Sequence, residues 1–295
     1  MNIISFEKIN STNTYAKSNI DTLIDRTIIS ADVQTHGYGR FDRKWVDLGV
    51  ENIYMSFILK PSDTLCETHA NLTQYLSVCL CEEIENIVVT PHPSPPPQVG
   101  RENCCNSSPF KNVKGSELLA STPTPPEGEG WGGGYSIQPQ IKWPNDVLLN
   151  GKKVCGILAE SIIKGGKLKG IVLGIGVNLN ASIDNLNEID RPATSLNIEL
   201  GKNINKKEFM QNLIDRFFAN YDEFLQKGFV MIKDDYEARS MLCVEKGKKN
   251  KENIKIAVFN IIKEGKFNGF DNNGNLLLLN KDGKLENINM GEIVG

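Results

Sequence analysis

A run of apolar segments between residues 137 and 180 constrains the fold more than any other feature of the chain. The segments are rich in Val, Ile and Leu, and short turns separate them at residues 144–146, 150–151 and 164–167. The second of these turns is Asn-Gly, a pair typical of tight hairpins, and the third contains Gly-Gly. Successive hairpins place strands side by side, so the sequence predicts an antiparallel or mixed sheet.

The rest of the chain supplies further strands and several helices. Strands are predicted at residues 3–9, 27–35 and 52–61, and helices at 11–20, 67–87, 205–229 and 231–240. Ser11 or Thr12 is placed to cap the first helix. After residue 240, short apolar runs alternate with turns, as in a small β-barrel. We therefore predict an α+β fold: a mixed β-sheet domain with packed helices over residues 1–240, and a small β-domain over residues 241–295.

Residues 88–136 differ in composition from the rest of the chain. The segment holds most of the prolines together with Gly, Ser and Glu, and it offers hardly a pair of apolar residues to bury. Such a composition cannot bury enough apolar surface to offset the entropy lost on ordering. We predict a disordered insertion at about residues 88–136. The fold can tolerate it, because the free-energy cost of closing a loop grows only slowly with loop length.

Composition and charge exclude several classes of protein. The formal net charge is −3 and no tail or helix concentrates Lys and Arg, so we expect no nucleic-acid partner. The N-terminus lacks the pattern of a signal peptide, and no stretch approaches the roughly 18 apolar residues of a membrane span. The seven cysteines have neither a disulfide nor a zinc-site spacing. The sequence thus predicts a cytoplasmic protein without a membrane partner.

The segment QTHGYGRFDRKW, residues 34–45, is both flexible and basic. Gly37 and Gly39 allow the backbone to approach a ligand closely, and Arg40 and Arg43 carry planar charged groups that suit phosphate or carboxylate. The spacing is not that of a P-loop. One interpretation is a loop that folds over a nucleotide anion, and the other is a solvated surface loop.

Two later motifs favour the first interpretation. In KWPND, Lys142 lies between an apolar strand and a Trp-Pro turn, which would hold its ammonium group near the loop arginines. Asp146 could help to bind Mg²⁺, or it could cap the turn through its own backbone. In GIGVNLN, Gly174 could make room for a ligand near Asn178, or it could serve close strand packing.

Together these motifs resemble those of biotin protein ligases of the monofunctional type, which lack an N-terminal DNA-binding domain. The resemblance is carried by STN, ADVQTHGYGRFDRKW, NIYMSF, KWPND, GKKVCGILAES and GIGVNLN, in the family's order. The segment GFDNNGNLLLLNKDGKLENINMGEI is similar to the family's small SH3-like domain. The resemblance covers nearly all of the chain outside residues 88–136.

The resemblance implies a two-step reaction that uses ATP and Mg²⁺. The carboxylate of biotin would attack the α-phosphorus of ATP to give biotinyl-5′-AMP. A lysine of a biotin carboxyl carrier protein, part of a biotin-dependent carboxylase, would then take the biotinyl group. Segment 34–45 would close over the adenylate and exclude water. Exposed sheet edges would allow a homodimer.

The resemblance also implies roles for individual residues. The expected catalytic residues are Lys142, Arg40 and Arg43, and Asp146 is the expected Mg²⁺ ligand. The expected biotin-binding residues are Ser11, Thr12, Asn13, Gln34, Gly37, Tyr54, Ser56, Lys142, Gly156, Leu158 and Gly174. The expected nucleotide-binding residues are Gly37, Gly39, Arg40, Arg43, Trp45, Lys142 and Asn178.

One position departs from the family pattern, and two other functions stay open. Tyr38 stands where many members have an arginine, so we expect the loop to close but to hold the adenylate less tightly. A lipoate or octanoate ligase shares the catalytic fold, although KWPND and the C-terminal segment favour biotin. An inactive biotin-binding protein is the other alternative, and the presence of Lys142, Arg40 and Gln34 together argues against it.

Overall fold

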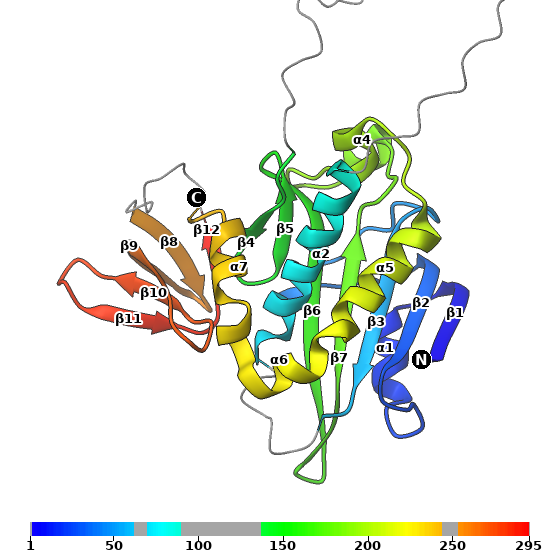
Figure 1. The fold of residues 1–295 in the computed structure, drawn as a ribbon, viewed down its shortest axis with the longest axis horizontal. Helices are drawn as coiled ribbons and strands as arrows, with labels where there is room; N and C mark the ends of the chain where they lie inside the picture. Colours follow the sequence, from blue (N-terminus) through cyan, green and yellow to red (C-terminus); the bar gives the residue numbers. More distant parts are fainter. Residues whose placement is uncertain (1, 62–69, 90–136, 244–252, 295) are drawn as a thin grey trace, which may run out of the picture. The chain divides into compact units, whose positions relative to one another are not determined.

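The computed structural model describes residues 2–61, 70–89, 137–243 and 253–294. A seven-stranded sheet with the order β1-β2-β3-β7-β6-β5-β4 lies at their centre (Figure 1). Its strands are β1 (Asn2–Ile9), β2 (Thr27–Gln34), β3 (Ile53–Leu59), β4 (Gln140–Lys142), β5 (Asp146–Leu149), β6 (Lys152–Lys164) and β7 (Lys167–Val177). Strand β1 pairs with β2 in parallel and the other pairs are antiparallel, which confirms the predicted mixed sheet.

The hairpins between β5, β6 and β7 form where the turn signals predict them. Asn150 and Gly151 have φ angles of 49° and 74°, the positive values that a two-residue hairpin turn of this type needs. These turns set the register of β6 on β7, in which Gly156 lies opposite Gly176. The same register places the glycine-rich parts of both strands at the middle of the sheet.

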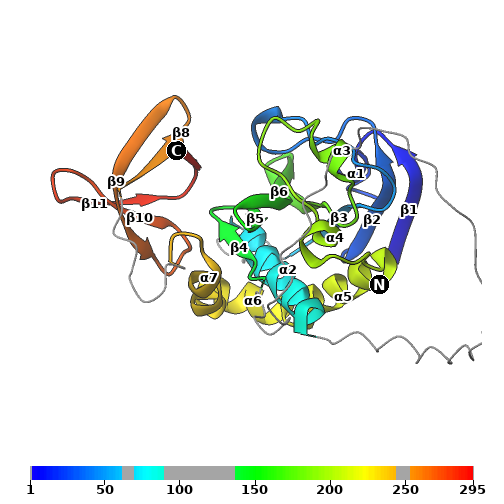
Figure 2. The same cartoon turned by 90° about the horizontal axis from the view of Figure 1, so that it is seen from above.

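Helices cover one face of the sheet with an apolar core. Helices α2 (Leu72–Val89) and α5 (Lys206–Ala219) lie on this face, and α1 (Thr12–Ser18) lies on the other (Figures 1 and 2). Phe57 of β3 packs on Phe217 of α5, with ring centroids 4.6 Å apart, and Tyr75 of α2 stacks on Phe224 at 4.4 Å. This aromatic cluster supplies much of the burial that stabilises the domain.

Two details of the predicted helices are wrong. Helix α2 extends to Val89, so the first two residues of the predicted insertion are helical, and the rest of it lies outside the described residues. The predicted helix 205–229 is interrupted at Asn220, where φ and ψ are −122° and 10°, and α6 (Tyr221–Lys227) starts after it. The break separates Phe217 from Phe224, and both side chains reach the core around Tyr75.

Short elements connect the sheet to the C-terminal part. After α6 come η3 (Gly228–Met231) and α7 (Lys233–Arg239), and earlier lie η1 (Arg40–Asp42), α3 (Ile183–Leu186) and α4 (Leu196–Leu200). Neither α3 nor α4 was predicted, because four or five residues give too few turns for a helical period. Among the described residues, no helix is long and apolar enough to cross a bilayer.

The C-terminal residues form a separate antiparallel sheet, as predicted. Its strands are β8 (Asn253–Val258), β9 (Ile261–Phe270), β10 (Leu276–Leu279), β11 (Leu285–Ile288) and β12 (Glu292–Val294), in the order β11-β10-β9-β8-β12. Phe270 of β9 contacts Tyr236 of α7 edge to face, with centroids 5.2 Å apart. The molecule therefore has the predicted α+β fold, with a large mixed sheet and a small all-β part.

Candidate active site

A cavity of about 190 Å³ lies on the α1 face of the large sheet. The start of α1, the loop between β2 and β3, the β4–β5 turn, the first half of β6 and the end of β7 form most of its walls, and residues 189–193 and Glu292 complete them. The sequence-predicted residues that line it are Ser11, Thr12, Asn13, Gln34, Gly39, Arg40, Arg43, Trp45, Lys142, Asp146, Gly156, Leu158, Gly174 and Asn178. Motifs far apart in the chain therefore meet around a single cavity.

Glycines form the floor of this cavity beneath the indole ring of Trp45. A Cβ atom built on Gly176 would lie 2.5 Å from Cε2 of Trp45, and one on Gly156 would lie 2.8 Å from Cζ3. Only glycine allows a ring to approach the strands this closely. The indole Nε1 is buried and has no hydrogen-bond partner among the described residues.

The end of the cavity next to α1 is polar and closely hydrogen-bonded. The backbone N–H of Thr12 donates to Oε1 of Gln34 at 2.7 Å, and its hydroxyl donates to the same oxygen at 3.1 Å. The hydroxyl of Ser56 lies 2.8 Å from that of Thr12 and 2.6 Å from Oδ1 of Asn13. All four side chains are at most 9% exposed, so their hydrogen-bonding groups are shielded from bulk water.

A carboxylate on β6 sets the orientation of the Asn13 amide. Nδ2 of Asn13 donates to Oε2 of Glu160 at 2.8 Å, and an ionised carboxylate can only accept hydrogen bonds. Oδ1 of Asn13 therefore points toward Ser56 and the cavity floor, where a Cβ on Gly174 would lie 2.2 Å away. The Gln34 amide is oriented by Thr12, which donates two hydrogen bonds to its oxygen. Its Nε2 therefore remains a donor without a partner among the described residues.

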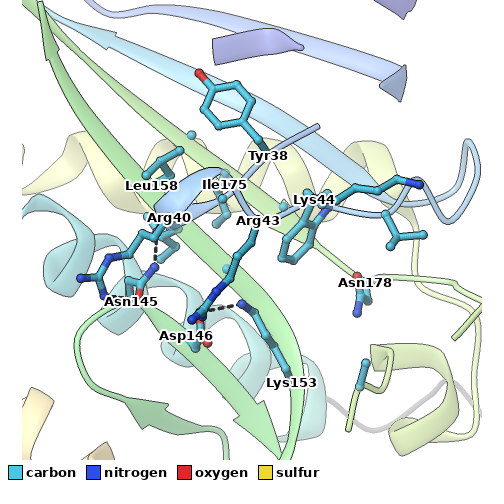
Figure 3. Close-up of a pocket in the computed structure, with 18 of the residues that line it drawn as sticks. Tyr38, Arg40, Arg43, Lys44, Asn145, Asp146, Lys153, Leu158, Ile175 and Asn178 are labelled. Carbon is cyan, nitrogen blue, oxygen red and sulfur yellow. Dashed lines mark hydrogen bonds and ion pairs between the residues drawn. The ribbon is translucent and has the colours of Figure 1, made fainter. Parts of the chain in front are cut away.

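The opposite end of the cavity is cationic. Arg40, Arg43 and Lys153 gather near Asn145 and Asp146 in Figure 3, whereas Tyr38 lies at the other end. Nη1 of Arg40 donates to the carbonyl of Gly291 at 2.9 Å and lies 3.4 Å from Oδ1 of Asn145. Burial lowers the pKa of Arg40, and the nearby carboxylates of Glu292 and Asp146 oppose that effect.

One carboxylate of the C-terminal sheet pairs with two arginines at this end. Oε2 of Glu292 accepts from Arg43 at 2.6 Å and its Oε1 accepts from Arg191 at 3.0 Å. Burial alone would raise the pKa of Glu292, but the two arginines outweigh it and hold the pKa below its usual value. Glu292 thus occupies cationic groups that an anionic ligand would also contact.

Lys153 and Asp146 form an ion pair at the cationic end of the cavity. Nζ of Lys153 lies 2.8 Å from Oδ1 of Asp146 (Figure 3). The same Nζ lies 5.3 Å from the centroid of the Trp45 ring. Lys142 lines the same cavity, and its ammonium makes no hydrogen bond or ion pair with any described residue. Two lysines therefore line the cavity near the loop arginines, and Asp146 already pairs with one of them.

The donor set fits a protein-bound metal poorly. Within the described ranges, no group of three or more His, Cys, Asp or Glu side chains could hold an ion. Asp146, the expected Mg²⁺ ligand, is paired with Lys153 instead. Mg²⁺ is often held by one or two carboxylates together with substrate phosphates, so a metal here would have to enter with a nucleotide.

Three of the expected ligand-binding residues do not line the cavity. Gly37 is part of the loop hairpin, and a Cβ added to it would lie 3.0 Å from the carbonyl oxygen of Trp45. Tyr54 is 2% exposed, and its hydroxyl accepts from the backbone N–H of Leu48 at 2.8 Å. Ser56 is fully buried behind Thr12 and Asn13. Their side chains or backbone support the cavity walls rather than face a ligand.

Sequence reasoning missed Lys153, Arg191 and Glu292, which all line the cavity. Lys153 belongs to the GKKVCGILAES motif, and strict alternation along β6 would place it on the face opposite Gly156. A shift in register between β5 and β6, next to Val154, turns it to the cavity instead. Glu292 lies some distance along the chain from every other lining residue, and no motif marks it.

Comparisons with known proteins agree with this arrangement. The sequence model of the Biotin/lipoate A/B protein ligase family matches residues 5–178, more than half of the chain. The "Bifunctional ligase/repressor BirA" of Bacillus spizizenii is 29% identical over 258 residues, which cover 87% of this chain and 62% of that protein. The "Biotin--[acetyl-CoA-carboxylase] ligase" of Paracoccus denitrificans is 34% identical over 146 residues, 49% of this chain and 58% of that protein.

A solved structure shares the fold over nearly the whole chain. The biotin protein ligase from Aquifex aeolicus in complex with biotin and ATP matches with a TM-score of 0.71 and 24% identity, covering 99% of this chain and 97% of that one. The chain spans 62% of the length of the BirA proteins that it matches. On the family match and the shared fold, this chain belongs to the biotin/lipoate A/B protein ligase family.

Proposed function

We propose that the protein activates biotin with ATP and transfers it to a lysine of a biotin carboxyl carrier protein. The carboxylate oxygen of biotin forms a bond to the α-phosphorus of ATP, and pyrophosphate leaves. The lysine amine of the carrier then attacks the carbonyl of biotinyl-5′-AMP, and AMP leaves. Relatives named as biotin--[acetyl-CoA-carboxylase] ligases support this reaction.

The polar end of the cavity carries the proposal. Oδ1 of Asn13 is held as an acceptor and Nε2 of Gln34 remains as a donor. A cyclic urea, the head group of biotin, offers N–H donors and a carbonyl acceptor that complement this pair. The dithiolane ring of lipoate has neither. Binding it would leave Nε2 of Gln34 without a partner and Oδ1 of Asn13 with only its bond from Ser56, which a site built for polar groups disfavours.

The cationic end suits the phosphates and the biotin carboxylate. Arg40, Lys142 and Lys153 line it, and positive groups fixed in a cavity stabilise the charge that develops on the phosphoryl oxygens. Lys142 has no carboxylate partner among the described residues, so its whole charge is available to the phosphate, whereas Lys153 is held in place by Asp146 and shares its charge with that carboxylate. Arg43 would leave Glu292 to contact the phosphate.

The loop between these ends would close over the adenylate. Gly39 N–H donates to the carbonyl of Arg43 at 2.8 Å and Trp45 N–H donates to that of Gly37 at 2.9 Å, so the loop folds as a small hairpin. Trp45 offers a flat apolar surface between the two ends, and Asn178, which also lines the cavity, would contact the nucleotide. Excluding water there would protect the mixed anhydride from hydrolysis.

The remaining expectations belong to the same proposal. Mg²⁺ would enter with ATP as a co-substrate, and Asp146, a carboxylate that lines the cationic end, would approach it. A cytoplasmic location suits a carboxylase partner. The edge strand β1 could pair with a second copy and form a homodimer.

Pyrophosphate release from ATP and Mg²⁺ by the purified protein tests the proposal. We expect pyrophosphate release with biotin. With lipoate, the rate should not exceed the rate measured when neither biotin nor lipoate is present. Release with lipoate or octanoate alone would instead support the alternative ligase. Biotin binding without any pyrophosphate release, from protein shown to be folded, would support an inactive biotin-binding protein.

A further inference from the structure

Glu160 receives hydrogen bonds from two parts of the cavity that are distant in sequence. Its Oε2 accepts from Nδ2 of Asn13 and from the hydroxyl of Tyr38, both at 2.8 Å. Its Oε1 accepts from Nζ of Lys17 at 2.6 Å. Asn13 belongs to the polar end, whereas Tyr38 is the loop residue that replaces the arginine of many family members.

The Tyr38 contact holds one arm of the loop hairpin. Tyr38 pairs with Lys44 across the hairpin in an antiparallel bridge, and Trp45 follows immediately on the second arm. Holding Tyr38 therefore restrains the position of the Trp45 ring on the glycine floor. Lys17 lies 5.1 Å from the centroid of the Tyr38 ring and supports the tyrosine from its other side.

The Asn13 contact sets what the polar end presents to a ligand. Because Glu160 takes the amide N–H₂, Asn13 presents its oxygen toward Ser56 and the floor. Ser56 continues the network to Thr12, and Thr12 continues it to Gln34. A single carboxylate thus contacts both the loop and the hydrogen-bond network that faces the ligand.

We infer that Glu160 is a positioning residue that couples the biotin-binding end of the cavity to the closed loop through the hydroxyl of Tyr38. The inference rests on the proposed function for its ligand, but the contact itself exists in the protein without any ligand. The hydroxyl of Tyr38 donates to the Glu160 carboxylate at 2.8 Å, so the bond is to an acidic group. Hydrogen bonds to charged groups are stronger than neutral pairs, so removing this one should loosen the loop measurably.

The first experiment measures the loop without substrate. Trypsin cleavage after residues 40, 43 and 44 is followed in the wild-type protein, Tyr38→Phe, Glu160→Gln and the double variant, with Tyr15→Phe as a matched control. Tyr15 lies on α1 and packs on Phe6 away from Glu160. We expect each variant to be cleaved about 5- to 10-fold faster. The double variant should be no faster than Glu160→Gln, and the control should match the wild type.

The second experiment measures biotin affinity and the release of bound biotinyl-5′-AMP. Tyr38→Phe should speed adenylate release several-fold and change biotin affinity by less than about 3-fold. Glu160→Gln should speed adenylate release and also lower biotin affinity, because it frees the Asn13 amide as well as the Tyr38 hydroxyl. Tyr38→Arg, which offers Glu160 a charged donor, should release the adenylate more slowly than Tyr38→Phe does, but it should not do so in the Glu160→Gln background.

Specific results would overturn the inference. Additive effects of Tyr38→Phe and Glu160→Gln on cleavage, in variants with wild-type melting temperatures, would mean that the two residues act separately. Cleavage equal to that of the wild type in both variants would mean that the contact does not restrain the loop. A wild-type protein that releases no pyrophosphate would refute the proposed function, and the cleavage experiment would still decide the inference.

Discussion

The two faces of strand β7 differ in chemistry although one short stretch of chain supplies both. Leu173 faces the helices and belongs to the core that contains Phe57 and Phe217. Gly174 and Gly176 face the cavity, where added Cβ atoms would collide with Asn13 and Trp45. The helix face stabilises the fold by burying apolar area. The cavity face buries less apolar area, because its glycines leave room for the polar Asn13 side chain and the Trp45 ring to lie close to the strand.

This difference predicts that substitutions on the helix face change stability and those on the cavity face change activity. The largest effect is expected for Phe217→Ala, because Phe217 is fully buried among the rings of Phe57, Tyr75 and Tyr221. Truncating such a ring costs about 3–5 kcal/mol of unfolding free energy. Urea unfolding measures the loss, and kcat/KM for biotin-dependent pyrophosphate release should stay within about 2-fold while the variant is folded.

A loss of activity by folded Phe217→Ala comparable to its loss of stability would break the comparison. It would mean that the helix face shapes the cavity through the sheet.

The next effect concerns the two lysines of the cavity face. We expect Lys153→Met to lower kcat/KM for adenylation about 10²- to 10³-fold, because it removes a fixed positive charge at the phosphate end. Its unfolding free energy should change by less than about 1 kcal/mol, since the ion pair with Asp146 is partly exposed. Pyrophosphate release and urea unfolding measure the two quantities.

Lys142→Met is the matched comparison for this prediction. Its ammonium has no carboxylate partner among the described residues, so its charge is fully available to the phosphate and we expect a loss of activity at least as large. A loss confined to Lys153→Met would instead give the catalytic role to the lysine that sequence reasoning missed.

A change of one carbon on each face of β7 gives a third test. Gly176→Ala adds a methyl group that would lie 2.5 Å from the Trp45 ring, so the ring must move. Displacing a positioning group by about 1 Å can cost about 10²-fold in rate, and we expect up to that loss in kcat/KM. Leu173→Val removes one carbon from the helix face and should cost about 1 kcal/mol of stability with little effect on rate.

Steady-state kinetics and urea unfolding of this pair separate the two faces. If Gly176→Ala were as active as the wild type, the contact between Trp45 and the floor would not matter for the reaction.

The smallest expected effect depends on pH and concerns the charges beside the cavity. Arg43 and Arg191 hold the pKa of Glu292 below its usual value in the folded protein. Their pairing therefore stabilises the fold above the ordinary pKa of a glutamate, and the contribution is lost as pH falls through the lower folded-state value. Glu292→Gln should lower the unfolding free energy near pH 7 by less than about 1 kcal/mol.

Urea unfolding of wild type and Glu292→Gln between pH 3 and 7 measures this contribution. We expect the difference to shrink toward zero at the acid end. A difference that is constant across this range would mean that the Glu292 carboxylate contributes through packing rather than charge.

Much of the fold could be predicted because it depends on local patterns. The hairpins after Asp146 follow from turn residues with positive φ, and the helix that begins at Thr12 follows from its Ser11 cap. The interruption at Asn220 could not be predicted, since Asn is tolerated within a helical period and tertiary packing around Tyr75 decides where the chain turns.

The site was predicted in part for the same reason. Gly174, Arg40 and Trp45 belong to recognisable motifs, and the structure brings them to one cavity. Tyr54 was expected to bind biotin, but its side chain does not line the cavity, and its hydroxyl accepts a hydrogen bond from the backbone of Leu48. Which strand residues face a ligand depends on what the neighbouring loops leave open.

By itself, the sequence determined the strands, their turns, the glycine floor and the basic loop, because side-chain period and turn chemistry act over a few residues. Tertiary structure alone decided which groups complete the cavity. The register shift beside Val154 turned Lys153 toward it, and the folding of the C-terminal sheet placed Glu292 against Arg43. Such placements depend on contacts between residues far apart in the chain, and no local pattern records them.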